Sequence, residues 1–208
     1  MMCKSFWRKS MLVSAVMALV ATAGCIGGAR STGWSPGRSQ VSPTLAPYIH
    51  FEEGDLAFFA VNTHLARLSL KEDLIPLEIA IANKSMDLLT VAPELIILRD
   101  MEGNRWPVAS AAESAGKSLQ SRFSRNLQPV PFLDTVQLHF SAYQALPATF
   151  GLRPGDYTMT RTVEMRKKTW IYAQIWFPNP GGALKGRQFE IWLNSPELPE
   201  PIFTTIQF

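Results

Sequence analysis

From Tyr48 to the end of the chain, apolar residues recur with a period of two. Leu77, Ile79 and Ile81, for example, alternate with one acidic and two small residues. Successive side chains of a strand point to opposite faces, so this pattern predicts strands. Short apolar stretches with turn signals about every ten residues are typical of a β-sandwich. We predict a mainly β domain over residues 48–208, with strands at Leu77–Ala82, Leu88–Val91, Glu94–Arg99, Gln188–Leu193 and Ile202–Phe208 and a long β-rich stretch at Tyr157–Phe177.

Two stretches depart from this pattern and predict one or two short inserted helices. Ala109–Asn126 is rich in Ala, Ser, Lys and Arg, a composition that favours a helix. Residues 132–145 fit two structures. Leu133, Val136 and Phe140 have helical spacing, whereas Val136, Leu138 and Phe140 alternate as in a strand, and periodicity does not choose between them.

The first 24 residues have the composition of a secretory signal peptide. Lys4, Arg8 and Lys9 precede an apolar run, Met11–Ala23, and then Gly24. The whole chain has 20 Lys and Arg against 17 Asp and Glu, so removal of this segment leaves 17 of each sign. Because an electrostatic nucleic-acid binder needs a basic surface, a neutral mature chain argues against that class.

The residues before Cys25, Ala21-Thr22-Ala23-Gly24, resemble the lipobox of bacterial lipoproteins, although Thr22 stands where that family prefers Leu. The resemblance implies a diacylglyceryl group on the Cys25 thiol and cleavage before it. The residue after the cysteine is Ile26 rather than Asp. In this family that implies a location at the outer membrane, with the domain facing the periplasm. The alternatives are an ordinary signal peptide with an unrelated cysteine, or a short membrane helix, for which the run is too short to span about 30 Å of hydrocarbon comfortably.

Residues 25–47 form the predicted linker. Glycines, prolines and serines punctuate it, and it has few large apolar residues to offset the entropy of ordering. A flexible chain of this length averages about 25 Å end to end. The layout is therefore a lipid at Cys25, a flexible tether and a folded domain. Cys3 leaves with the signal peptide, and the Cys25 thiol carries the lipid. The mature chain then has no free thiol for a disulfide or a Cys-based metal site.

Three motifs in the β-rich part resemble those of uncharacterised immunoglobulin-like domains in bacterial lipoproteins. They are a strand ending in Asn83, a strand followed by Asp100-Met-Glu-Gly103, and a strand ending in Phe177-Pro178. The resemblance covers most of the chain from about residue 57 and implies an immunoglobulin-like sandwich. Physically, Asn83 and Gly103 suit turns that need positive φ, and a proline ends a strand.

The chain carries no motif that predicts catalysis. Gly33-Trp34-Ser35-Pro36-Gly37 matches a nucleophile elbow but lies in the linker, without the strand and helix that an elbow needs. His50, His64 and His139 lack the spacing of metal ligands on one helix. We therefore predict no enzyme, no cofactor and no metal site, with a metal site of His and carboxylates assembled in space as the alternative.

Aromatic residues mark a candidate binding face. Within Thr169–Phe177, alternation places Trp170, Tyr172 and Trp176 on the face opposite the predicted core. Trp192 joins them if Gln188–Leu193 pairs with this strand. Two interpretations remain: the helical segment covers this face, or the face is an exposed patch for a partner or glycan.

The resulting functional expectation is a lipid-anchored protein of the bacterial cell envelope that acts as a non-enzymatic interaction or accessory module. Its partners are then the membrane, through the lipid, and another envelope protein. The alternative is a periplasmic binder of a glycan or small ligand that uses the exposed aromatic face.

Overall fold

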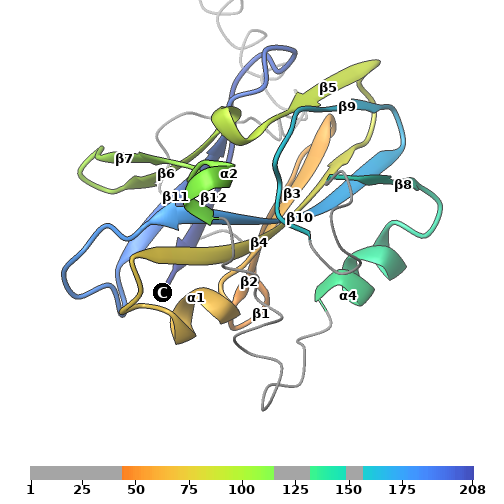
Figure 1. The fold of residues 1–208 in the computed structure, drawn as a ribbon. Helices are drawn as coiled ribbons and strands as arrows, with labels where there is room; N and C mark the ends of the chain where they lie inside the picture. The colour runs from red at the N-terminus through yellow and green to blue at the C-terminus, as the bar shows by residue number, and fades with distance from the viewer. Residues whose placement is uncertain (1–43, 115–131, 149–156) are drawn as a thin grey trace, which may run out of the picture. The chain divides into compact units, whose positions relative to one another are not determined.

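The computed structural model describes residues 44–114, 132–148 and 157–208 (Figure 1). The predicted signal peptide, Cys25, the linker up to residue 43 and residues 115–126 of the predicted helix lie outside the described residues. Thr44–Ala46, which we expected in the linker, forms the first strand. The folded part therefore begins before Tyr48.

The larger sheet has six strands in the order β1-β2-β3-β4-β10-β8. All neighbours are antiparallel except β10 and β8. The longest pairing, between β4 and β10, is aligned from Thr169 opposite Asn83 to Pro178 opposite Leu74. The strands are β1 (Thr44–Ala46), β2 (Ile49–Glu53), β3 (Ala57–Asn62), β4 (Leu74–Asn83), β8 (Gln144–Pro147) and β10 (Thr169–Pro178).

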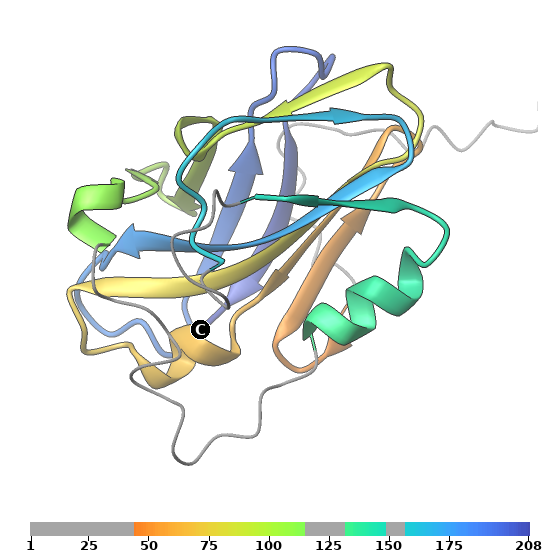
Figure 2. The same cartoon turned by 45° about the vertical axis from the view of Figure 1, so that its right-hand side comes forward.

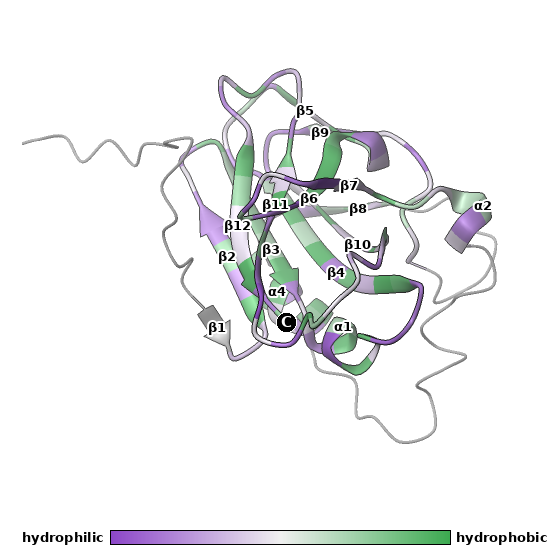
Figure 3. Cartoon of the chain, turned by 90° about the vertical axis from the view of Figure 1, so that its left-hand side faces the viewer, coloured by the Kyte–Doolittle hydropathy of each residue, from purple (hydrophilic) through white to green (hydrophobic). Residues whose placement is uncertain are grey.

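The second sheet has four antiparallel strands in the order β12-β11-β6-β7. Its β12 lies beside β2 of the larger sheet (Figure 3). Two further strands pair with each other, β5 (Leu88–Val91) and β9 (Val163–Arg166). The strands of the second sheet are β6 (Ile96–Asp100), β7 (Arg105–Pro107), β11 (Gln188–Leu193) and β12 (Ile202–Gln207), and the helices are α1 (His64–Leu68), a 3₁₀ turn (Pro93–Leu95), α2 (Ala111–Ser114) and α4 (Phe132–His139).

The two sheets pack on one apolar core, which confirms the predicted β-sandwich. Ile171, Ala173, Ile175 and Phe177 of β10 face this core as alternation predicted, and each is almost fully buried. Alternate residues of β6, β11 and β12 enter it from the second sheet. Burial of apolar surface between the sheets is the main stabilising contribution, at about 25 cal/mol per Å². The immunoglobulin-like order of strands stays a prediction.

Residues 132–145, which periodicity left open, form α4 and then a turn. Phe132, Val136 and Phe140 share one side of this segment and pack on the larger sheet. The chain then enters β8 at Gln144 (Figure 2). The helical interpretation is correct because a sheet surface is available for the stripe of apolar residues.

A turn follows Asn83 and another contains Gly103, as predicted, but only Gly103 has positive φ. Gly103 has φ +94° in the β6–β7 hairpin, a conformation that glycine adopts without strain. Asn83 ends β4, and its φ is not positive. Lys168 is instead the non-glycine residue with positive φ among the described residues, at +60°. Its backbone N–H donates to the Asn83 carbonyl at 2.8 Å, and its carbonyl accepts from the Gln144 N–H at 3.0 Å. Lys168 thus links β4, β10 and β8.

His50 on β2 is a buried titratable group. It is 7% exposed, and its Nε2 has no hydrogen-bond partner among the described residues. Burial, and secondly the nearby Arg67 guanidinium, lower the pKa of His50 to about 4. Between these two pKa values, His50 therefore stays neutral in the folded protein but is protonated in the unfolded chain, where its pKa is the ordinary 6.5.

Stability is accordingly expected to fall as the pH drops below about 6.5, with the full loss reached below about 4. Between about pH 8 and about pH 5, His50 is expected to cost about 2 kcal/mol of unfolding free energy. Urea titrations at both pH values, on the wild type and on His50→Gln, measure this. The variant should lose less stability by that amount, and parallel losses in the two proteins would contradict the assignment.

Candidate functional site: an aromatic ridge on the four-stranded sheet

Three of the four predicted binding-face aromatics are buried, so the exposed-patch interpretation is wrong for them. Trp170 is 5%, Tyr172 8% and Trp176 3% exposed. Trp170 and Tyr172 lie in the apolar cluster formed with α4, whereas Trp176 packs with Leu74 and Ala109. The physical reason is that both faces of β10, an interior strand of its sheet, are covered, so its outer face carries apolar residues as well.

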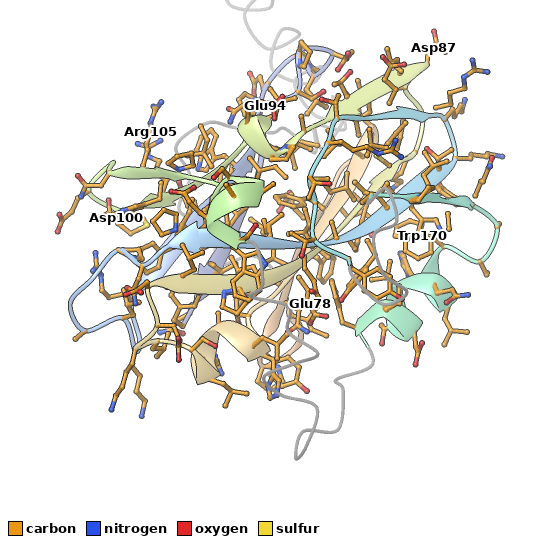
Figure 4. All side chains as sticks on the ribbon, in the orientation of Figure 1. Glu78, Asp87, Glu94, Asp100, Arg105 and Trp170 are labelled. Carbon is orange, nitrogen blue, oxygen red and sulfur yellow. The ribbon has the colours of Figure 1, made fainter. Side chains whose placement is uncertain are left out.

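A polar group separates these two clusters on the outer face. The Tyr172 hydroxyl donates to Glu78 Oε1, and Asn62 Nδ2 donates to Glu78 Oε2 at 2.7 Å. Burial raises the pKa of the Glu78 carboxyl, and these two hydrogen bonds oppose the rise. Asn62 Oδ1 in turn accepts from the His64 N–H at 3.0 Å, so the group also fixes the start of α1. Figure 4 shows Glu78 near the middle of the sheet and Trp170 beside α4.

Sequence reasoning missed this group because the alternation around Glu78 is also that of a solvent-facing position. The pairing of strands places Asn62 opposite Glu78, and Gln174 opposite Glu78 on the other side. Asn62, Glu78 and Gln174 thus form a row of three polar residues across the sheet. This row can be recognised in the sequence only when the strand order is known.

Trp192, the fourth predicted aromatic, lies on the other sheet. The condition under which Trp192 would join the other three, pairing of Gln188–Leu193 with β10, is not met, since β11 pairs with β6 and β12. Trp192 faces away from the core, because Ile191 and Leu193 on either side of it point inward. It is only partly buried, as are its two cross-strand partners, Ile97 and Phe203. We call Ile97, Trp192 and Phe203 the aromatic ridge.

The ridge has a defined geometry. The Trp192 and Phe203 rings stack, with centroids 4.7 Å apart and planes inclined by 14°. Arg99 lies over the Trp192 ring, with Cζ 5.5 Å from the centroid. Because β12 and β6 flank β11 on opposite sides, Phe203 and Arg99 occupy opposite faces of the indole. The indole Nε1 donates to Glu190 Oε2 at 2.9 Å. The ridge therefore presents ring edges, with both ring faces and the N–H already engaged.

Charged residues border the ridge in the next row of the sheet. Arg105 lies opposite Arg99, and Arg99 lies opposite Glu190. Pro107 extends the apolar row beyond Ile97 and is exposed. The sheet face thus has a partly buried apolar row with a charged border, and protein–protein interfaces also have an apolar centre and a polar rim. The sequence identified Trp192 as a candidate binding residue. It did not identify Phe203, because the pairing of the two residues depends on the register of β11 and β12.

The described residues meet the requirements of neither a metal site nor a membrane-spanning helix. Among residues 44–114, 132–148 and 157–208, no group of three or more His, Cys, Asp or Glu side chains could hold a metal ion. Within the same ranges, no helix is both long and apolar enough to cross a membrane.

The fold and site together define a β-sandwich protein with an aromatic ridge on one sheet. No protein-family model and no curated protein matches the chain. Among solved structures it is similar to the yjhA protein of Bacillus subtilis, with a TM-score of 0.40, 8% identity, and coverage of 76% of this chain and 96% of that one. It is also similar to a putative lipoprotein, ycdA, of Bacillus subtilis, with a TM-score of 0.37, 13% identity, and coverage of 76% of this chain but 38% of that one. Similarity at this level defines neither a family nor a function for this chain.

Proposed function

We propose that this chain is a lipid-anchored protein of the bacterial cell envelope whose sandwich binds another envelope protein through the aromatic ridge. One observation supports the anchoring part of the proposal. Cys25 ends a lipobox-like segment, so acyl chains hold the domain at a membrane surface. Tethering raises the local concentration of the domain near partners at that membrane.

The observation that supports binding of another envelope protein is the aromatic ridge itself. Trp192 keeps part of its surface accessible, and so do its apolar cross-strand neighbours Ile97 and Phe203, while the next row of this sheet face is charged. A glycan that stacks on an aromatic ring needs a free ring face, and both faces of Trp192 are occupied. Ring edges flanked by Arg99 instead fit a partly apolar protein surface with acidic groups at its border. The alternative of a glycan stacked on this face is therefore disfavoured.

A photo-crosslinking amino acid at exposed Pro107 tests this surface in living cells. One discrete adduct with a second protein is expected, and it should fall at least about tenfold in the Trp192→Ala background, because truncating a central aromatic residue costs about 1.4 kcal/mol or more of binding free energy. The same crosslinker at exposed Met101, on the turn of the β6–β7 hairpin, is the matched control and should give no such adduct.

Two results would contradict the proposal. One is an adduct whose yield is the same with and without the Trp192 side chain, provided that both proteins show the same thermal unfolding. The other is an adduct composed of two copies of this chain, which would make the ridge a self-association surface.

A further inference from the structure

Three consecutive cations, Arg166, Lys167 and Lys168, lie at the turn from β9 into β10. All three residues are exposed, and no ion pair of their side chains is found within residues 44–114, 132–148 and 157–208. The turn lies between β5, which pairs with β9, and β8, which pairs with β10 (Figure 1). We call these three residues the basic turn. The protein contact proposed above does not use their charge.

The segments beside the basic turn add little negative charge. Neither β5 nor β8 contains a charged residue. Asp87 directly precedes β5, across from the turn, and offsets one positive charge. Lys84, in the turn after β4, is paired with Glu53 at 2.8 Å and so adds no net charge. The basic turn is therefore a local cationic surface on a chain that is neutral beyond the predicted signal peptide.

An apolar side chain lies next to these charges. Leu88, the first residue of β5, pairs with Arg166 and is one of the exposed large apolar residues, at 37%. Cations beside an exposed apolar residue are typical of surfaces that lie against a lipid bilayer, where the apolar group enters the headgroup region. This arrangement favours a bilayer as the partner of the basic turn.

The proposed anchor makes a bilayer available, and the inference rests on that part of the proposed function. A tether that averages about 25 Å keeps the domain near the bilayer but does not fix which side faces it. Each Lys or Arg beside an anionic bilayer raises affinity about fivefold, so three together favour their own contact about a hundredfold, a preference that Asp87 reduces. Such a gain does not replace acyl chains, but it orients a domain that they already hold.

We infer that the basic turn binds the phosphate groups of anionic phospholipids and orients the sandwich with the β9–β10 turn against the anchoring membrane. Ammonium and guanidinium groups donate charge-assisted hydrogen bonds to phosphate oxygens, and Leu88 contacts the headgroup region beside them. The basic turn shares no residue with the aromatic ridge. Either surface can therefore be lost without the other.

Fluorescence quenching at the two ends of the β4–β10 pairing tests this orientation. Residues 26–208, with a polyhistidine tag in place of Cys25, are held on vesicles by a nickel-chelating lipid, so lipidation of Cys25 is not needed. This chain has no cysteine, and a single one is introduced for the fluorophore. Ser85→Cys places it in the turn after Asn83, whose carbonyl accepts from the Lys168 N–H at 2.8 Å. Ala183→Cys places it in the loop after β10, about 30 Å away along the strands.

Nitroxide on the lipid headgroups quenches a fluorophore that touches the bilayer. On vesicles with phosphatidylglycerol, the Ser85 label should be quenched at least about fivefold more than the Ala183 label. On phosphatidylcholine vesicles with the same content of chelating lipid, this preference should be lost. Arg166→Gln/Lys167→Gln should remove most of the preference on phosphatidylglycerol, because two charges account for about a twenty-fivefold gain in affinity. The double variant leaves Lys168, with its positive φ, in place.

Lys71→Gln/Lys185→Gln is the matched control, since it removes the same charge from two exposed residues at the other end of the β4–β10 pairing. It should keep the preference, and equal thermal unfolding of the two double variants excludes a folding defect. Equal quenching of both labels on phosphatidylglycerol would overturn the inference and leave an acidic protein surface as the partner. An equal preference on both vesicles, or an equal loss in the control variant, would also overturn it. None of these results bears on lipidation of Cys25, which is measured separately by membrane fractionation of the full chain.

Discussion

Cys25→Ser is expected to move the protein from the membrane fraction to the soluble fraction. A serine hydroxyl cannot form the thioether that the lipobox-like segment implies, so neither the diacylglyceryl group nor the later acyl chain is added. Each buried CH₂ of an acyl chain contributes about 0.8 kcal/mol of membrane binding, and two chains give stable anchoring. Loss of the lipid therefore removes nearly all membrane affinity. Carbonate-washed membranes and incorporation of labelled palmitate measure the two effects.

Cys3→Ser is the matched control, because Cys3 is the only other cysteine of the chain and lies inside the predicted signal peptide. It should sediment with membranes and take up label as the wild type does. Cys25 lies outside the sandwich at 44–208, so the Cys25→Ser domain should unfold at the wild-type temperature. A Cys25→Ser protein that still sediments and still carries label would refute lipid attachment at this residue.

Asn83→Ala is expected to destabilise the sandwich by about 3 kcal/mol. Asn83 is fully buried at the end of β4. Its Nδ2 donates to the carbonyls of Met86 at 2.9 Å and Met165 at 2.8 Å, and its Oδ1 accepts from the Met86 N–H at 2.9 Å. Alanine leaves these backbone groups without their partner, and a buried polar group left unpaired costs about 1–3 kcal/mol. Urea denaturation monitored by tryptophan fluorescence gives the difference.

Two further variants make this result specific. Asn83→Asp keeps an acceptor for Met86 but directs negative oxygen at the Met165 carbonyl, so it should be no more stable than the alanine variant. Ser85→Ala removes an exposed hydrogen bond to the Asp55 carbonyl in the same turn and should cost less than about 1 kcal/mol. If Asn83→Ala costs no more than Ser85→Ala, Asn83 does not join β4 to β9 as described.

Asn83 and β10 show which structural properties the sequence pattern predicts and which it does not. Alternation in Thr169–Phe177 correctly separated the core face from the other face, because side-chain direction is a local property of a strand. It could not show that the second face is also covered, since α4 covers Trp170 and Tyr172, Leu74 and Ala109 pack on Trp176, and all of these are distant in sequence. Asn83 was recognised as a strand end, but its partner Met165 lies 82 residues away. Long-range hydrogen bonds leave no local signal.

The candidate sites divide in the same way. Trp192 was identified as a candidate from the sequence, but its grouping with the β10 aromatics depended on a pairing of Gln188–Leu193 with that strand, which the structure does not have. Its stacking partner Phe203 and the polar row at Glu78 both arise from strand order and register. These are set by how several strands bury their apolar faces together, so no single segment encodes them.

The sequence by itself determined that this chain is a mainly β protein with a lipobox-like segment at Cys25 and a neutral charge beyond it. These properties depend on local alternation, on a short contiguous motif and on composition. Only the tertiary structure decided which aromatics are accessible, because accessibility depends on what other segments cover. It buried Trp170, Tyr172 and Trp176 under elements distant in sequence and left Trp192 beside Phe203 on the outer face of the second sheet.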